Sequence, residues 1–127
     1  MSEMTKERPK HLALHEIRLP LAGFASILHR VSGAGLFLML PLLIWLFGLS
    51  LRSSESFEAF KATVGHPVVK LVLLGLLWAY LHHFCMGIRI LLIDIHVGVE
   101  KAPARASALA VLVVSLALTV ILGAKLW

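Results

Sequence analysis

Three long apolar runs constrain this chain more than any other feature of its sequence. They cover residues 31–51, residues from about 68 to 88, and residues 106–124, and the second is uncharged from Leu71 onward. Each run is close to the roughly 20 residues that an α-helix needs to cross a bilayer. None shows the alternation of polarity expected of a membrane-spanning strand. The sequence therefore predicts an all-α membrane protein with three transmembrane helices.

The composition excludes several other classes of protein. Of the 127 residues, 59% are hydrophobic and 15% are charged, whereas a soluble domain has about 45–50% and about 25%. A disordered chain and a self-contained soluble enzyme are both excluded on this basis. Cys85 is the only cysteine, so the chain can form neither an internal disulfide framework nor a four-cysteine metal site.

The net charge of +5 does not indicate nucleic-acid binding. Such binding requires basic residues on one face together with stacking aromatic side chains, and here the aromatic residues lie inside the apolar runs. Lys and Arg that flank membrane spans explain the charge better.

The chain divides into a polar segment, residues 1–20, and a single membrane domain, residues 21–127. Glutamates interrupt the basic charge of the first segment and the following apolar run is too long for a signal peptide, so we expect a cytoplasmic or interfacial, polar or amphipathic segment. A short surface helix is expected near residues 55–64. The predicted spans are about 22–51, 68–95 and 105–126.

The distribution of Lys and Arg predicts the orientation of the spans. Eight lie on the side of the N-terminus and four on the other side, and such an excess marks the cytoplasmic side. The C-terminal Trp127 is then expected on the periplasmic side. The first group is Lys6, Arg8, Lys10, Arg18, Arg30, Arg89, Lys101 and Arg105, and the second is Arg52, Lys61, Lys70 and Lys125.

The first polar cluster lies at the start of the first span. Ala22, Ser26, Arg30 and Gly33 fall on one helical stripe of small and polar residues, which would let a helix or a flat ring approach closely. The Ser26 hydroxyl and the Arg30 guanidinium could hold a polar oxygen of an otherwise apolar ligand, and Arg30 could pair with a carboxylate. Alternatively, His29 and Arg30 simply anchor the helix at the lipid headgroups.

The second cluster lies inside the second span, where His82 and His83 are about 15 Å from its inner end by helical rise. Gly87 follows His83 by one turn and leaves a notch in which a planar macrocycle could lie. Imidazole is the usual axial ligand of a b-type haem. The alternative is a histidine that bonds to an adjacent helix. His82 points about 100° away from His83, as either an unrelated histidine or a hydrogen-bonding neighbour.

Two charged residues follow in the same span. Arg89 and Asp94 lie near its inner end, where long charged side chains commonly reach the interface or form an ion pair.

Together these clusters resemble the larger cytochrome b membrane anchor of bacterial succinate dehydrogenase, respiratory complex II. The first motif is Ser-Ile-Leu-His-Arg at residues 26–30, preceded by Arg8-Pro9 and followed by Gly33. The second is a histidine four residues before Gly-Ile-Arg, with an aspartate five residues after that arginine. The resemblance extends over nearly the whole chain. It departs at Ile90, where many relatives have a histidine directed toward a haem propionate.

The resemblance implies a bundle shared with a second small anchor subunit in the bacterial inner membrane. Together the two anchors would hold an iron–sulfur subunit and a flavoprotein on the cytoplasmic face, and the heterotetramer could assemble into a higher oligomer. Electrons from succinate would pass to ubiquinone, linking the tricarboxylic acid cycle to aerobic respiration. One haem b would lie between the anchors, with one axial histidine from each. This chain is not expected to carry out succinate chemistry itself. It is expected to contact membrane lipid and not to bind nucleic acid.

Residue by residue, the resemblance implies three groups of site residues. His83 would be the axial haem ligand. Ser26 and Arg30 would line the quinone site with Ile27 as an apolar wall. His29, Arg30 and Arg89 would lie near the propionates or support the haem, while His82 and Asp94 have no settled role.

Two other functions are compatible with the residues alone. One is a haem-poor anchor that only docks peripheral redox subunits. The other is a small oligomeric transporter or proton channel, although such proteins usually contain repeats and broken helices and none is visible here.

Overall fold

The computed structural model describes Lys10, His11 and residues 13–127. Residues 1–9 and 12 of the predicted N-terminal segment lie outside this description. They include Lys6 and Arg8 of the charge count and the Arg8-Pro9 pair of the first motif. The described residues before Leu21 form no helix. A turn closes there through a hydrogen bond from the Glu16 amide to the Ala13 carbonyl, at 3.0 Å.

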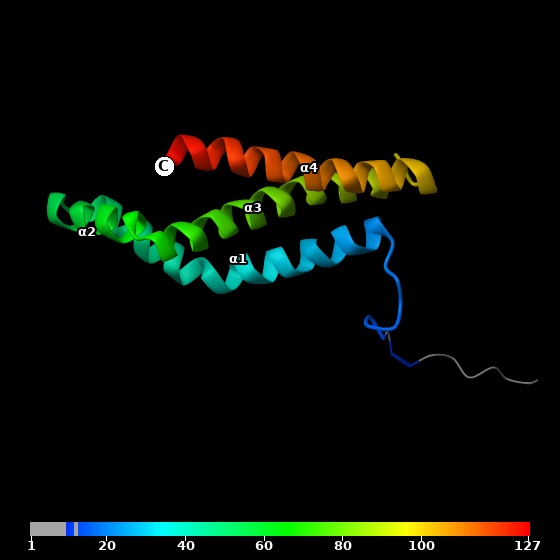
Figure 1. Ribbon diagram of the computed structural model, residues 1–127, viewed down its shortest axis with the longest axis horizontal. Helices are drawn as coiled ribbons and strands as arrows, with labels where there is room; N and C mark the ends of the chain where they lie inside the picture. The colour runs from blue at the N-terminus through cyan, green and yellow to red at the C-terminus, as the bar shows by residue number, and fades with distance from the viewer. Residues whose placement is uncertain (1–9, 12) are drawn as a thin grey trace, which may run out of the picture.

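Four helices follow, and the described residues contain no strand. Three long helices lie lengthwise beside one another and the short α2 joins two of them at one end (Figure 1). The expected all-helical fold with three long apolar helices is confirmed. The helices are α1 (Leu21–Arg52), α2 (Ser54–Gly65), α3 (Pro67–Asp94) and α4 (Lys101–Leu126).

Proline and serine mark where the first helices begin. Pro20 is the N-cap of α1, where a missing amide proton costs nothing. The helix continues unbroken past Pro41, as membrane helices allow. The surface helix α2 starts with a capping box, in which Ser53 Oγ accepts from the Ser56 amide at 3.1 Å and Ser56 Oγ accepts from the Ser53 amide at 2.9 Å.

The connection between α3 and α4 is a tight turn of irregular backbone. His96 and Gly98 have positive φ angles of 62° and 72°, which reverse the chain in few residues. Helix α4 then begins at Lys101, four residues earlier than the start at residue 105 expected from apolarity. Pro103 falls in the first turn of α4, where proline is tolerated.

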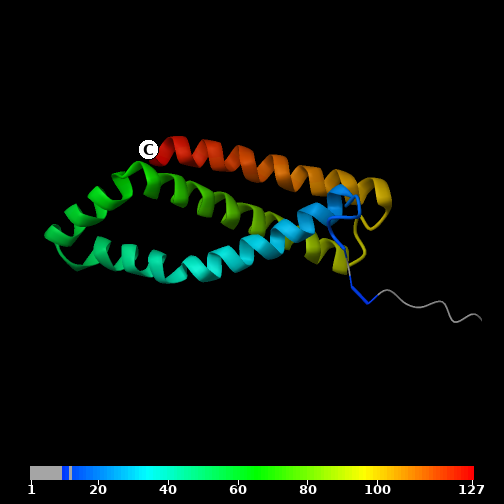
Figure 2. The same cartoon turned by 60° about the horizontal axis from the view of Figure 1, so that its bottom comes forward.

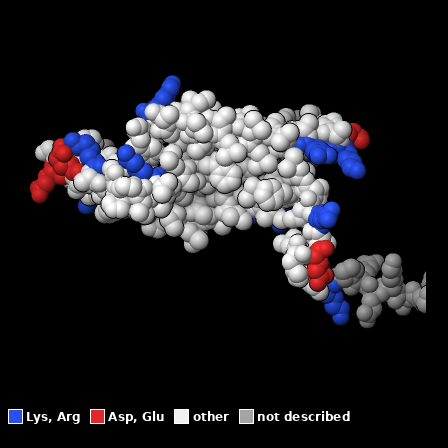
Figure 3. Space-filling model, viewed as in Figure 1, with Lys and Arg blue, Asp and Glu red and all other residues white. Residues whose placement is uncertain are grey.

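The surface is apolar along most of its length. The three long helices are long and apolar enough to cross a membrane, and large side chains such as Phe37 and Val120 are at least 70% exposed. Charged side chains gather toward the two ends of the bundle, with an uncharged region between them (Figure 3). This is the distribution that lipid requires, because charge is costly at the bilayer centre.

The packed core lies where the beginning of α1 meets α3 and α4. It consists of the buried residues Ala25, Met86, Ala108 and Val111. From there α1 and α3 diverge toward α2 (Figure 2). Small residues on α1 and α4 let the helices approach closely at this point, and the polar clusters described next lie directly beside it.

Candidate functional site

His83 faces α1 and is held there by its Nδ1 atom. This nitrogen lies 3.0 Å from the His29 carbonyl oxygen and 3.3 Å from Ser32 Oγ. Because a carbonyl can only accept, Nδ1 carries the proton and Nε2 has the lone pair. No hydrogen bond to Nε2 occurs within the described residues. A histidine fixed by one nitrogen to a carbonyl, with the other nitrogen free, is the arrangement typical of metal-binding histidines.

The two polar clusters predicted separately are in contact. The rings of His29 and His83 stack with their centroids 4.1 Å apart and their planes 13° apart. Ser32 also joins the contact, since its hydroxyl donates to the His29 carbonyl at 2.9 Å. Ser32 was not predicted, because a serine inside an apolar run carries no signal of its own.

Gly33 lets the His83 ring lie against the α1 backbone. A Cβ atom at this position would be 3.2 Å from Nδ1 of His83 and 2.8 Å from its Cε1, and the second distance is closer than packed atoms allow. The His83 ring therefore packs against the stripe of small residues on α1, at Gly33. At Gly87 an added Cβ would meet nothing within 4 Å, so the notch expected one turn from His83 is open space.

The residues present fit a haem better than a bare metal ion. No group of three or more His, Cys, Asp or Glu gathers among the described residues in the way that an ion would need. A haem brings its own iron ligands, so a single histidine from this chain would be enough to help hold it. His83 supplies a free Nε2, and Gly87 leaves room beside it.

Ser26, Ile27 and Arg30 lie on α1 beside these histidines. Arg30 is exposed, and Ser26 and Ile27 are half-buried. Within the part of the chain that the structure describes, the side chains of Ser26 and Arg30 form no hydrogen bond or ion pair. A hydroxyl and a guanidinium are therefore available to a ligand or to a partner.

His82 is completely buried and bonds to a different carbonyl of α1. Its Nε2 lies 3.4 Å from the Ala25 carbonyl oxygen, and its side chain has no solvent exposure. The ring of Trp78 lies 5.5 Å away, centroid to centroid. His82 thus lies in the interior between α1 and α3. Unlike Gly87, it has no open space beside it.

Arg89 binds α4, whereas the histidine pair lies against α1. Its Nε donates to Ser107 Oγ at 2.9 Å and its Nη2 donates to the Ala104 carbonyl at 3.1 Å. The side chain is only 8% exposed. The sequence did not reveal this contact, because the relative rotation of α3 and α4 is a property of their packing.

Two further predicted positions lie apart from the histidines. Asp94 is exposed at the end of α3 and forms no ion pair with another described residue. Ile90, which stands where many relatives have a histidine, packs against the core.

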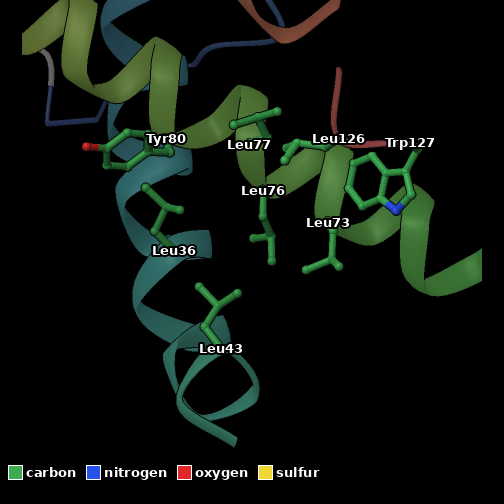
Figure 4. A pocket seen from close by; sticks show the side chains of 8 residues that line it. All are labelled: Leu36, Leu43, Leu73, Leu76, Leu77, Tyr80, Leu126 and Trp127. Carbon is green, nitrogen blue, oxygen red and sulfur yellow. The ribbon is translucent and has the colours of Figure 1, made fainter. Parts of the chain in front are cut away.

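A well-defined hollow lies away from these groups. An apolar pocket of about 330 Å³ opens between α1, α3 and the C-terminal end of α4 (Figure 4). None of the predicted site residues lines it. Its walls are Leu36, Leu43, Leu73, Leu76, Leu77, Tyr80, Leu126 and Trp127.

Comparison with known proteins decides the family. Residues 4–122 match the family described as the succinate dehydrogenase/fumarate reductase transmembrane subunit. The chain belongs to this family. The succinate dehydrogenase cytochrome b556 subunit of Coxiella burnetii is 35% identical over 98% of this chain and 100% of its own length. The subunit of the same name from Paracoccus denitrificans is 31% identical over 90% of this chain and 88% of its own.

Family membership confirms the broad identification made from the two motifs. The chain is a cytochrome b membrane anchor of complex II, and therefore the membrane subunit of an enzyme complex. Its three apolar helices make it a multi-pass membrane protein. A subunit of this kind associates with the other subunits of its complex.

Proposed function

We propose that this anchor binds one haem b through His83 and ubiquinone through Ser26 and Arg30, and that it conducts electrons from the iron–sulfur subunit to the quinone. The observation that carries the proposal is the hydrogen bond from His83 Nδ1 to the His29 carbonyl, at 3.0 Å. It leaves Nε2 as the free ligand atom, in the second span of a cytochrome b anchor.

The surrounding residues hold the imidazole in place. The bond to His29 fixes the tautomer and the ring plane, and Gly33 allows the ring to lie close to α1. Haem b, when bound, supplies one-electron storage between donor and acceptor. The second histidine that holds the haem would come from the second anchor subunit. His29 and Arg30 would meet the propionates, and Arg89 would support the site by holding α3 against α4.

Ser26 and Arg30 have the chemistry that quinone reduction requires. A quinone oxygen gains negative charge as electrons arrive, and a hydroxyl donor with a guanidinium stabilises that charge. Ile27 offers an apolar wall for the ring. No carboxylic acid occurs among residues 21–30, so the protons reach the quinone through water or from a partner side chain.

The excess of Lys and Arg supports an orientation with the N-terminus in the cytoplasm. The start of α1, with Ser26 and Arg30, then faces the iron–sulfur and flavoprotein subunits that oxidise succinate. The polar segment of residues 1–20 lies on the same side, and Trp127 faces the periplasm of the bacterial inner membrane.

The test is Arg30→Ala in the assembled complex, with Arg52→Ala at the other end of α1 as the matched control. We expect Arg30→Ala to reduce succinate-dependent quinone reduction at least roughly 10-fold, since it removes a charged donor that acts on the reacting oxygen. Succinate oxidation with a soluble artificial acceptor should survive in both variants. An equal loss of both activities in Arg30→Ala would indicate an assembly defect and contradict a quinone role.

A further inference from the structure

Adjacent histidines of α3 bind carbonyls on successive turns of α1. His82 bonds to Ala25 at 3.4 Å and His83 bonds to His29 at 3.0 Å. Residues four apart lie above one another on a helix, so the two bonds hold the same face of α1 at two points one turn apart. Ser26 and Arg30 each follow one of these anchored residues directly.

Burying the imidazole of His82 costs free energy of folding, so a compensating interaction is expected. Its exposure is 0%, and neither its Nδ1 nor the Nε1 of Trp78 has a hydrogen-bond partner among the described residues. An apolar side chain of similar size would avoid this cost. The bond to Ala25 is the one interaction that an apolar side chain could not make.

The acceptor of this bond belongs to the buried core of the described residues. Ala25 is fully buried and contacts the core formed with Met86, Ala108 and Val111. The Trp78 ring, tilted by 37°, lies near the His82 ring. Since Nδ1 is unpaired, the ring is expected as the neutral tautomer that donates through Nε2. A directional bond at this point fixes both the rotation and the height of α1 relative to α3.

We propose that His82 is a positioning residue for quinone reduction. Its bond to Ala25 sets the placement of the turn of residues 25–30, so that Ser26 and Arg30 meet the quinone oxygen. His83 fixes the same turn from the neighbouring bond, and the haem-ligating helix and the quinone-binding turn therefore move as one unit. The functional half of this inference rests on the quinone site proposed above.

The test compares His82→Gln with His82→Phe in the full complex. Glutamine can place an amide N–H near the position of Nε2, whereas phenylalanine fills the space without a donor. We expect His82→Phe to raise the KM for quinone roughly 3- to 10-fold, as expected for one lost hydrogen bond. Haem absorbance and the artificial-acceptor rate should be retained, and His82→Gln should recover most of the KM. His82→Asn, whose amide is too short to reach Ala25, should behave like His82→Phe and replaces it if the phenylalanine variant does not assemble.

A second readout separates the role of His82 from the quinone site itself. Hydrogen exchange of the amides of residues 25–30, measured without quinone, should be faster in His82→Phe than in the wild type and in His82→Gln. Unchanged exchange in His82→Phe, or equal effects of the Phe and Gln variants, would overturn the positioning role. Faster exchange with an unchanged KM would instead contradict the assignment of the quinone to this turn.

Discussion

Gly33 is the residue on which the geometry of His83 depends. Replacing it by alanine would place a Cβ 2.8 Å from the imidazole Cε1, so the ring must move from its position against α1. We expect Gly33→Ala to lower the haem content or to shift the haem absorbance of the purified complex. Gly35→Ala is the matched control, because its Cβ would meet nothing within 4 Å. If both variants gave the wild-type spectrum, the close approach of His83 to α1 would not matter for haem binding.

For single residues, the sequence indicates the types and spacings of the candidate site residues but few of their contacts. The choice of His83 rested on its spacing to Gly87, and Ser26 and Arg30 were chosen for sharing a helix face. The contacts of His83 with His29, Ser32 and Gly33 could not be predicted, because they depend on the register between two helices. For the same reason the contacts of Arg89 with Ser107 and Ala104 could not be predicted.

Helices α3 and α4 are joined by the buried Arg89. We expect Arg89→Ala to lower the thermal stability of the detergent-solubilised complex, since two hydrogen bonds from a charged donor are lost, each worth about 1.5–3 kcal/mol. The exposed Arg105→Ala, on α4, is the control. Thermal unfolding followed by light scattering measures the midpoint. An equal midpoint in the two variants would mean that the Arg89 contacts do not stabilise the helix pair.

The elements themselves were largely predictable, because their lengths follow from the thickness of a bilayer. Three apolar runs became α1, α3 and α4, and α2 lies where a surface helix was expected. Their ends were less predictable. Helix α4 starts at Lys101, with Pro103 in its first turn, and the polar residues of that turn are not marked by apolarity.

The whole molecule has charged ends and an apolar middle, and the charge imbalance between the ends predicts its orientation. We expect a cysteine at Trp127 to react with a membrane-impermeant maleimide added to intact cells whose outer membrane is permeabilised. A cysteine at Lys101 should react only after the inner membrane is opened. The native Cys85, half-buried within α3, provides the background to subtract. Labelling of the Lys101 variant alone in intact cells would reverse the proposed orientation.

Composition was sufficient at this scale to predict a membrane protein, and two short motifs were sufficient to predict its family. The partners of the exposed apolar surface could not be derived from the residues. A side chain that faces lipid and one that faces another subunit are both apolar. The second anchor subunit is therefore inferred from the family alone.

We propose that this anchor holds a haem b on His83. The decisive measurement is a reduced-minus-oxidised optical spectrum of the complex co-purified with the chain in mild detergent. We expect a b-type signal that succinate reduces at least in part, that His83→Ala removes or alters, and that His82→Ala affects less. A complex that oxidises succinate without any haem signal would contradict the claim and favour an anchor that only docks its partners. A signal lost in His82→Ala and kept in His83→Ala would show that the wrong histidine had been assigned.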